Sequence, residues 1–359
     1  MLLQLTDAGL WCEAANVYID PWRAVDRAIV THAHSDHLRG GSQRYIMAEP
    51  GIPVAMHRLG QFADRVSGVP YGETWLINGV RFSLHPAGHI LGSAQVRVEY
   101  RGEVWVVTGD YKLATDPTCA PWEPVPCHTF VTECTFGLPV YRWPDPTSVA
   151  DQINAWWADN AASQCTTLLY GYSLGKAQRL LALLDPSIGP VIVHGSIDAL
   201  NAGYRVAGVT LPQTHRFADM GKHDAWGRSL VLMPPSADAA IVERRSRQLS
   251  AGIASGWMQV RGMRRRRGVD RGFVLSDHVD WPSLLQAVSA SGAQRILATH
   301  GYVDVLVRWL REQGLEADAL ATPFRGEVDS ETEREADSGS LGDAKRNQTR
   351  DTTSDMTGV

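Results

Sequence analysis

Four side chains of the kinds that bind metal ions lie within six residues of the chain. The segment 32–37 reads HAHSDH, and it contributes His32, His34, Asp36 and His37. Imidazole and carboxylate ligands without a thiolate suit zinc, with manganese as the alternative. A chance grouping of surface residues is the other interpretation, and it requires four ligand-type residues to fall together in this order. The segment therefore predicts a metal site that supports hydrolysis.

The residues before this segment place it on a loop at the end of a strand. Residues 28–30 are a short apolar run with β-branched members, and Gly40 and Gly41 follow the motif. Alternation along an extended chain sends His32 and His34 to one side, and the next turn can direct Asp36 and His37 to a neighbouring point. One short loop could thus serve two metal ions about 3.5–4 Å apart.

Further ligand-type residues follow other apolar runs. His89 lies in PAGHILGS, Asp110 follows WVVTG, and His300 follows RILAT. By itself His89 is weak evidence, and Asp110 could be an ordinary turn residue. Together with the HAHSDH segment they supply enough side chains for two ions that share one carboxylate.

Composition indicates a globular protein with an acidic end. The chain has 359 residues, 44% of them hydrophobic, and a formal net charge of −5. Residues 327–359 hold nine acidic and four basic side chains and almost no large apolar ones, so they are predicted to be disordered. The sequence shows neither an apolar run long enough to span a membrane nor a signal peptide, and it predicts no membrane association and a cytoplasmic location. The five cysteines form no CxxC pair, so neither a disulfide framework nor a thiolate zinc site is expected.

The pattern of predicted secondary structure changes near residue 145. Before it, short strands are predicted at 17–19, 28–30, 81–84, 95–98, 104–107 and 129–131. After it, helices and strands alternate: a helix capped by Thr147 or Ser148 and running through Asn160, one opened by Ser173, a third over 197–206, and strands at 168–170, 191–193 and 230–232. This rhythm predicts a small parallel α/β unit inserted before the last ligand residues. A helix over 303–312 closes the fold.

The ordered motifs HAHSDH, GHILGS, TGDY and a late TH resemble the metallo-β-lactamase superfamily. TECTFG at 132–137, SDH at 276–278 and THG at 299–301 resemble motifs of its β-CASP branch, which consists of nucleic-acid nucleases. The resemblance implies an α/β fold: an αββα sandwich with an inserted β-CASP α/β cap domain. The implied boundaries are 1–143 and 266–326 for the two parts of the metallo-β-lactamase domain, 144–265 for the insertion and 327–359 for the acidic tail.

The resemblance also implies a role for each matched residue. His32, His34 and His89 would bind one Zn²⁺, Asp36, His37 and His300 the other, and Asp110 would bridge them. A metal-activated hydroxide would be the nucleophile, His278 the general acid, and Glu133 the residue that poises it. Asp20 in YIDP matches an aspartate that supports a ligand histidine from behind, and a turn aspartate before proline is almost as good a reading.

An arginine-rich segment before SDH is similar to that of the bacterial ligase-associated DNA exonucleases. The candidates for nucleic-acid contacts are Arg261, Arg264, Arg265, Arg266, Arg267 and Arg271, and a solvated charged loop is the alternative. GYSLGKA at 171–177 is short by one residue for a nucleotide phosphate loop, but Ser173 and Lys176 at a helix N-terminus could hold a nucleic-acid phosphate.

These features predict a dinuclear metal-dependent phosphodiesterase that acts as a single-strand DNA exonuclease in DNA repair. The implied partners are single-stranded DNA or DNA ends and, through the family resemblance, a DNA ligase and a helicase. An RNA-processing β-CASP nuclease is the alternative, because the ligands do not separate DNA from RNA. A small-molecule metallo-hydrolase would share the metal motif but not the α/β insertion or Glu133, and a non-catalytic DNA-binding scaffold does not explain the intact ligand set.

Overall fold

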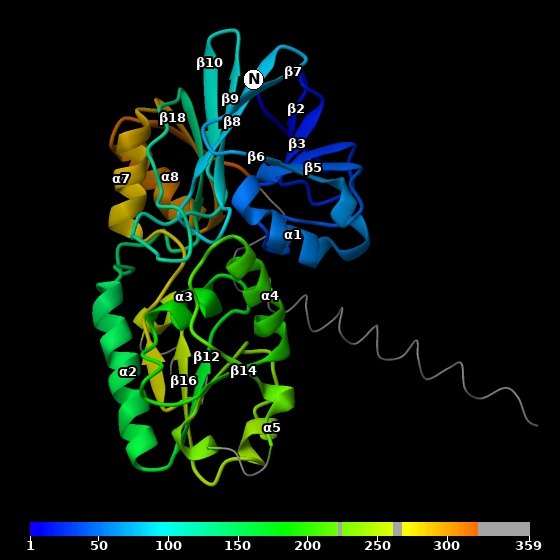
Figure 1. The fold of residues 1–359 in the computed structure, drawn as a ribbon. Coiled ribbons are helices and arrows are strands. Elements are labelled where there is room, and N and C mark those ends of the chain that lie inside the picture. The colour runs from blue at the N-terminus through cyan, green and yellow to red at the C-terminus, as the bar shows by residue number, and fades with distance from the viewer. Residues whose placement is uncertain (222–224, 261–267, 322–359) are drawn as a thin grey trace, which may run out of the picture.

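The computed structural model describes residues 1–221, 225–260 and 268–321 and arranges them around three β-sheets. Figure 1 shows two lobes: one holds the N-terminal and C-terminal parts of the chain, and the other holds the middle part with α2 to α5. The fold matters here for the edge at which the ligand-type residues meet.

The first sheet has six strands in sequence order from β1 to β6. Strands β3 to β6 pair in parallel, which sends the end of β4 and the loop after it to one edge of the sheet. The strands are Gln4–Thr6, Gly9–Cys12, Val17–Ile19, Arg27–Ile29, Arg44–Ala48 and Val66–Val69.

The second sheet has seven strands in the order β19, β18, β11, β10, β9, β8, β7. Its strands are β7 to β11 at Thr74–Ile77, Val80–Pro86, Ala94–Tyr100, Glu103–Val107 and Thr129–Cys134, with β18 at Arg295–Gly301 and β19 at Glu316–Ala319. β10 and β11 pair in parallel, and β11 pairs in parallel with β18, so three neighbouring strands end at the same edge.

The third sheet is entirely parallel among its recorded pairs, with the order β14, β13, β15, β12, β16, β17. Its strands β12 to β17 are Thr166–Tyr170, Val191–Val193, His215–Arg216, Leu230–Met233, Leu249–Ala254 and Arg271–Phe273. The predicted parallel α/β arrangement is therefore present. Strand β17 extends this sheet past residue 265, where the insertion was expected to end, and the domain boundaries stay a prediction.

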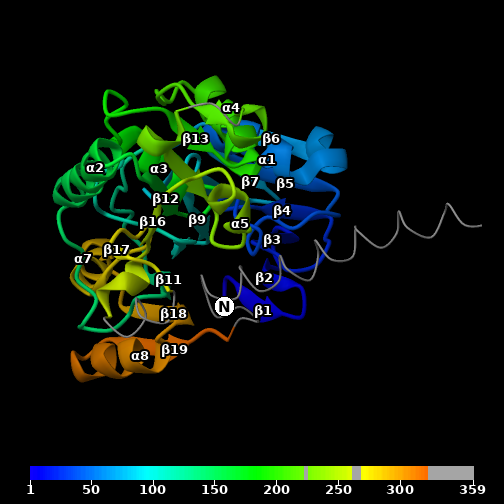
Figure 2. The same cartoon turned by 90° about the horizontal axis from the view of Figure 1, so that it is seen from below.

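Helices cover the sheets. They are α1 to α5 at Ile52–Leu59, Pro146–Ala162, Lys176–Leu183, Gly195–Val206 and Ala240–Glu243, with α7 at Trp281–Ser291 and α8 at Val303–Glu312. Short 3-10 turns lie at Glu49–Gly51, Gly60–Arg65, Phe217–Asp219, Trp226–Arg228 and Gly256–Gln259. In Figure 2 α7 and α8 lie beside β11, β18 and β19, and α1 and α4 lie together next to β5 and β6.

Five buried clusters lie among the described residues, and three of them show how the layers of the first and second sheets are joined. One joins the first and second sheets through residues such as Ile19, Ile29 and Val96. A second joins the second sheet to α7 and α8 through Phe130, Leu284 and Leu310. A third joins the first sheet to the middle lobe, because Tyr204 of α4 packs with residues of β4, β5 and α1. The lobes therefore share a packed apolar interface.

Several sequence expectations needed correction. The first long helix is capped by Asp145, whose carboxylate accepts from the backbone N–H of Ser148, with Pro146 in the first turn, so neither Thr147 nor Ser148 is the cap. The next helix begins at Lys176 rather than Ser173. Helices α1, α5 and α7 were not predicted. The acidic tail at 327–359 lies outside the described residues.

Candidate metal centre and proton donor

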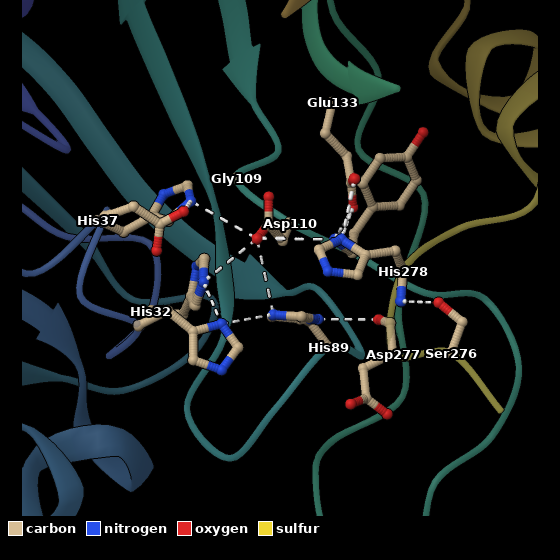
Figure 3. A network of polar contacts seen from close by, with 12 residues as sticks. His32, His37, His89, Gly109, Asp110, Glu133, Ser276, Asp277 and His278 are labelled. Atoms are coloured by element: carbon tan, nitrogen blue, oxygen red, sulfur yellow. Dashed lines mark hydrogen bonds and ion pairs between the residues drawn. The ribbon is translucent and has the colours of Figure 1, made fainter. Parts of the chain in front are cut away.

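The ligand-type residues meet where strands of the first and second sheets end. The segment 32–37 follows β4, the loop between β8 and β9 carries His89, Asp110 follows β10, Glu133 lies in β11, and His300 lies near the end of β18. His278 comes from the chain that returns from the third sheet. In Figure 3 dashed lines join the carboxylate of Asp110 to His32, His37, His89 and His278.

The first donor set consists of His32, His34, His89 and Asp110, whose ligand atoms all lie within 4.8 Å of one another. His34 Nδ1 lies 3.1 Å from His32 Nε2 and 3.0 Å from His89 Nε2. Asp110 Oδ2 lies 3.5 Å from His32 Nε2 and 3.7 Å from His89 Nε2. Ligand atoms of a tetrahedral zinc site lie about 3.3 Å apart, since each Zn–N bond is about 2.0–2.1 Å. The spacing of this set fits one such ion.

The outer nitrogens of these histidines face oxygen atoms of the protein. His34 Nε2 lies 3.2 Å from Leu174 O, and His89 Nδ1 lies 2.8 Å from Asp277 O. A carbonyl oxygen only accepts, so each of these nitrogens carries the proton. The inner nitrogen of each ring then keeps its lone pair for a metal, which is the usual arrangement behind a metal-bound histidine.

The second donor set consists of His37, Asp110 and His300. His37 Nε2 lies 3.5 Å from Asp110 Oδ2 and 3.6 Å from Asp36 Oδ2, and within the described part of the chain this buried atom makes no hydrogen bond. A buried nitrogen with two carboxylates at this distance and no hydrogen bond is suited to a metal ion. His300 has φ +57°, an uncommon conformation for a residue other than glycine, as is often found where a side chain is held for function. Asp110 belongs to both sets, as a bridging ligand must.

Asp20 lies behind the second set. Its Oδ2 lies 2.7 Å from His37 Nδ1, and its two oxygens accept from the backbone N–H and the hydroxyl of Thr31. The carboxylate thus keeps the His37 proton on Nδ1 and leaves Nε2 toward Asp110. The structure places Asp20 where the predicted supporting residue should be, although the role itself stays a prediction.

His278 and Glu133 form a separate pair beside both donor sets. His278 Nδ1 lies 3.0 Å from each oxygen of Glu133 and 4.0 Å from Asp110 Oδ2. Glu133 also accepts from the backbone N–H of Tyr111, which fixes its orientation. The backbone of His278 is held as well, because its N–H donates to Ser276 Oγ and its carbonyl accepts from Trp143 Nε1.

Burial and charge control the protonation of the cluster. Burial is the main cause that lowers the pKa of His34 and of His89 to about 3, and it also lowers the pKa of His32 and His300. For His37, burial alone would lower the pKa, but Asp110, Asp36 and Asp20 raise it well above the usual value. The imidazoles of the first set, those of His32, His34 and His89, are therefore neutral at pH 7, which is the form that binds a metal.

For Asp110, burial would raise the pKa, but the charges of His37 and His278 lower it well below the usual value. The carboxylate is thus ionised at neutral pH. An ionised oxygen that both donor sets share is the ligand that two neighbouring cations require.

Two of the expected nucleic-acid contacts are not available. Lys176 is fully buried, and its Nζ lies 3.1 Å from Asp277 Oδ2. Ser173 is buried, and its hydroxyl lies 2.9 Å from that of Ser196. The expectation for these two residues was wrong, because the helix N-terminus faces the interior instead of solvent. Arg271 is exposed on β17, and Arg261, Arg264, Arg265, Arg266 and Arg267 lie outside the described residues.

Several residues that organise the centre were not predicted. Thr31 and Tyr111 stand beside motif residues, and their adjacency was the only available signal. Arg179 donates to the carbonyl of Ser276 and lies in a helix with no matching motif. Only the packing of the third sheet against the other two brings it to the site.

No protein-family model matches the chain. The chain is similar to a protein of Opitutus terrae named Probable DNA ligase, at 34% identity over 316 residues, which cover 87% of this chain and 30% of that protein. It is also similar to Endoribonuclease YSH1 of Eremothecium gossypii, at 28% identity over 166 residues, 46% of this chain and 20% of that protein. The same-named protein of Saccharomyces cerevisiae is 29% identical over 126 residues, 34% of this chain and 16% of that protein. The chain thus spans less than a third of the length of these curated relatives.

A solved structure, a protein of unknown function from Enterococcus faecalis, has a similar fold. It superposes with a TM-score of 0.54 at 12% identity, over 86% of this chain and 81% of that chain. In the described residues no helix combines the length and apolar character needed to cross a membrane. The curated relatives confirm the resemblance of the chain to the β-CASP branch of the metallo-β-lactamase superfamily that the sequence motifs predicted.

Proposed function

We propose that the chain is a dinuclear metal-dependent nuclease that cleaves phosphodiester bonds. The observation that carries this proposal is the pair of donor sets that share Asp110, with the His278–Glu133 pair beside them. His32, His34 and His89 would hold one metal ion, and His37, Asp36 and His300 the other. The histidine-rich, thiolate-free set favours two Zn²⁺, with Mn²⁺ as the alternative.

When bound, such a pair of ions would supply an activated water and would neutralise negative charge on the phosphate. The role of His278 follows from its surroundings. Glu133 favours a proton on Nδ1, so Nε2 is the atom that exchanges a proton with the substrate. His278 then donates a proton to the departing sugar oxygen, and Glu133 and the backbone contacts of the 276–278 segment keep the ring in place.

The architecture that the resemblance implies is part of the proposal. The first and second sheets share a core, α1 contacts the first sheet, and α7 and α8 pack on the second. We assign these layers to the αββα sandwich and the third sheet with its helices to the β-CASP cap. The cap would limit the opening above the ions to a single strand.

Single-stranded DNA is the proposed substrate. The relative named Probable DNA ligase aligns with most of this chain, and a DNA ligase acts on DNA ends, so a nuclease that trims such ends in DNA repair fits beside it. Association with a ligase or helicase and a cytoplasmic location remain predictions. RNA is the second candidate, because other relatives are named Endoribonuclease YSH1.

The test compares matched single strands of DNA and RNA, each labelled separately at the 5′ and 3′ end, with Zn²⁺ and with Mn²⁺. We expect stepwise shortening of DNA from one end. Faster cleavage of RNA would overturn the choice of DNA, and internal cleavage would overturn the exonuclease assignment. Turnover of lactones or thioesters without any cleavage of either strand would overturn the nuclease itself.

A further inference from the structure

Five charged side chains are buried together next to the first donor set but touch none of its ligand atoms. They come from three segments that are distant in the sequence: the loop after β10, helix α3, and the chain after β17. None is more than 9% exposed: Lys112 1%, Asp116 9%, Lys176 0%, Arg179 2% and Asp277 5%. Burial of so many charges is costly unless they are paired, so this arrangement requires a reason.

Arg179 links the two carboxylates of the cluster. Its Nη1 donates to the carbonyl of Ser276 at 2.6 Å and lies 3.1 Å from Asp277 Oδ1, while its Nε lies 3.4 Å from Asp116 Oδ2. Lys112 Nζ contacts the same Asp116 oxygen at 2.7 Å, and Lys176 Nζ lies 3.1 Å from Asp277 Oδ2. The planar guanidinium thus spans two carboxylates and a carbonyl, which an ammonium group cannot reach at once.

The cluster contacts the 276–278 segment, which also contacts the metal centre. The backbone carbonyl of Asp277 accepts from His89 Nδ1, and the next residue, His278, faces Glu133. The loop before α3 contributes a second acceptor, because Leu174 O lies 3.2 Å from His34 Nε2. Two of the three histidines of the first donor set therefore donate to backbone carbonyls that lie next to α3 and the ion cluster.

We propose that Arg179 is a positioning residue for the first metal ion, acting through Ser276 and Asp277 on His89. By fixing the Asp277 carbonyl, it keeps the proton of His89 on Nδ1 and the lone pair of Nε2 toward the ion. This inference rests on the proposed metal centre and extends it to a residue of the α/β unit. Through Arg179 the α/β unit, besides shaping the substrate opening, completes the metal site.

Zinc affinity of the first set is the measurement that tests this proposal. It is made on the full chain by competition with a chelator, in a His300→Ala background that removes a ligand of the second set. Loss of an outer partner of a metal-bound histidine lowers metal affinity by about 10–100-fold. We expect a loss of this size for Arg179→Lys and for Arg179→Ala, with Arg179→Lys the milder of the two because it keeps the charge near Asp277.

Two controls separate positioning from general damage. The first is Arg308→Ala, an exposed arginine on α8, which should leave zinc affinity unchanged. The second repeats the Arg179 variants in a His89→Ala background, where only the second set is intact and its affinity should not change. Arg179→Ala removes a buried partner of two carboxylates, so near-UV circular dichroism checks that each variant is folded. If the Ala variant is unfolded, the zinc affinity of the Lys variant decides the test.

Unchanged affinity of the first set in a folded Arg179→Lys protein overturns the inference. Equal losses at both sets also overturn it, because they would show a general loosening of the fold. The readout is metal binding, so it does not depend on nuclease activity. A wild-type protein that binds two zinc ions but cleaves neither DNA nor RNA would reject the proposed function and leave this inference to the zinc data.

Discussion

The carboxylate of Asp20 and the imidazole of His37 are joined by a contact of 2.7 Å between Oδ2 and Nδ1. Asp20 has φ +44° and also accepts from the backbone N–H of Thr31 at 2.7 Å. A strained backbone that holds one carboxylate against two donors is consistent with a residue that orients a metal ligand.

Replacement of Asp20 should weaken binding of the second metal ion. We expect Asp20→Ala to lower its affinity by about 10–100-fold, because His37 loses the acceptor that keeps its proton on Nδ1. Asp20→Asn should lose less, since the amide oxygen can still accept and asparagine tolerates a positive φ. A two-step zinc titration monitored by chelator competition measures both steps. A loss confined to the first step would contradict the assignment of Asp20 to His37.

His278 and Asp110 should separate proton transfer from metal binding. We expect His278→Ala to keep two metal ions per chain and to lose turnover by about 10²–10⁴-fold, the usual contribution of a general acid. Asp110→Ala should lose metal as well, because both donor sets share this carboxylate. Metal content by elemental analysis and cleavage of a labelled strand are measured on the same samples.

The matched control is His57→Ala, which removes an exposed imidazole of α1. It should retain both metal content and turnover. A His278→Ala protein that cleaves at the wild-type rate would remove the general-acid assignment.

The ligand residues could be predicted because they follow apolar runs at strand ends, and each run carries its own local signal. The helix over 303–312 was also predicted from the sequence, and α8 has these bounds. Lys176 was expected to hold a nucleic-acid phosphate because it lies at a predicted helix N-terminus in a segment that resembles a phosphate loop. Such a local pattern says nothing about what packs against the lysine. Its partner Asp277 lies about a hundred residues further on, so only the folded chain shows that this lysine is buried.

Gly301 should be far less tolerant of a side chain than Gly314, although both have a left-handed backbone. Their φ values are +81° and +84°. A Cβ at Gly301 would lie 2.3 Å from Cys134 O and 2.4 Å from Thr135 Cα, whereas nothing lies within 4 Å of one at Gly314. Gly314→Ala should therefore cost only the backbone strain, about 1 kcal/mol.

Gly301→Ala adds a clash with the backbone of Cys134 at the end of β11 and of Thr135 just after it, next to His300. We expect a loss of unfolding free energy of about 3 kcal/mol or more, together with weaker binding of the second metal ion. Urea denaturation of the two variants gives the difference. Equal losses would show that the contact with Cys134 relaxes without cost.

The stability of the metal-free protein should fall with acidification between pH 6.5 and about pH 3. The pKa values of His34 and His89 are lowered from 6.5 to about 3 in the folded chain, mainly by burial. Below pH 6.5 the unfolded chain takes up protons on these imidazoles and the folded chain does not, so protonation favours unfolding by about 1–2 kcal/mol per imidazole by pH 5.

His37 acts in the opposite direction, because its raised pKa adds stability that is present below pH 6.5 and is lost as the pH rises through its folded value. That contribution is constant below pH 6.5, so the lowered pKa values of His34, His89, His32 and His300 determine the trend in this range. Urea denaturation of chelator-treated protein at pH 7, 6 and 5 measures the trend, and a His34→Gln, His89→Gln double variant should flatten it. A metal-free protein that becomes more stable between pH 6.5 and 5 would contradict the neutral state of these ligands.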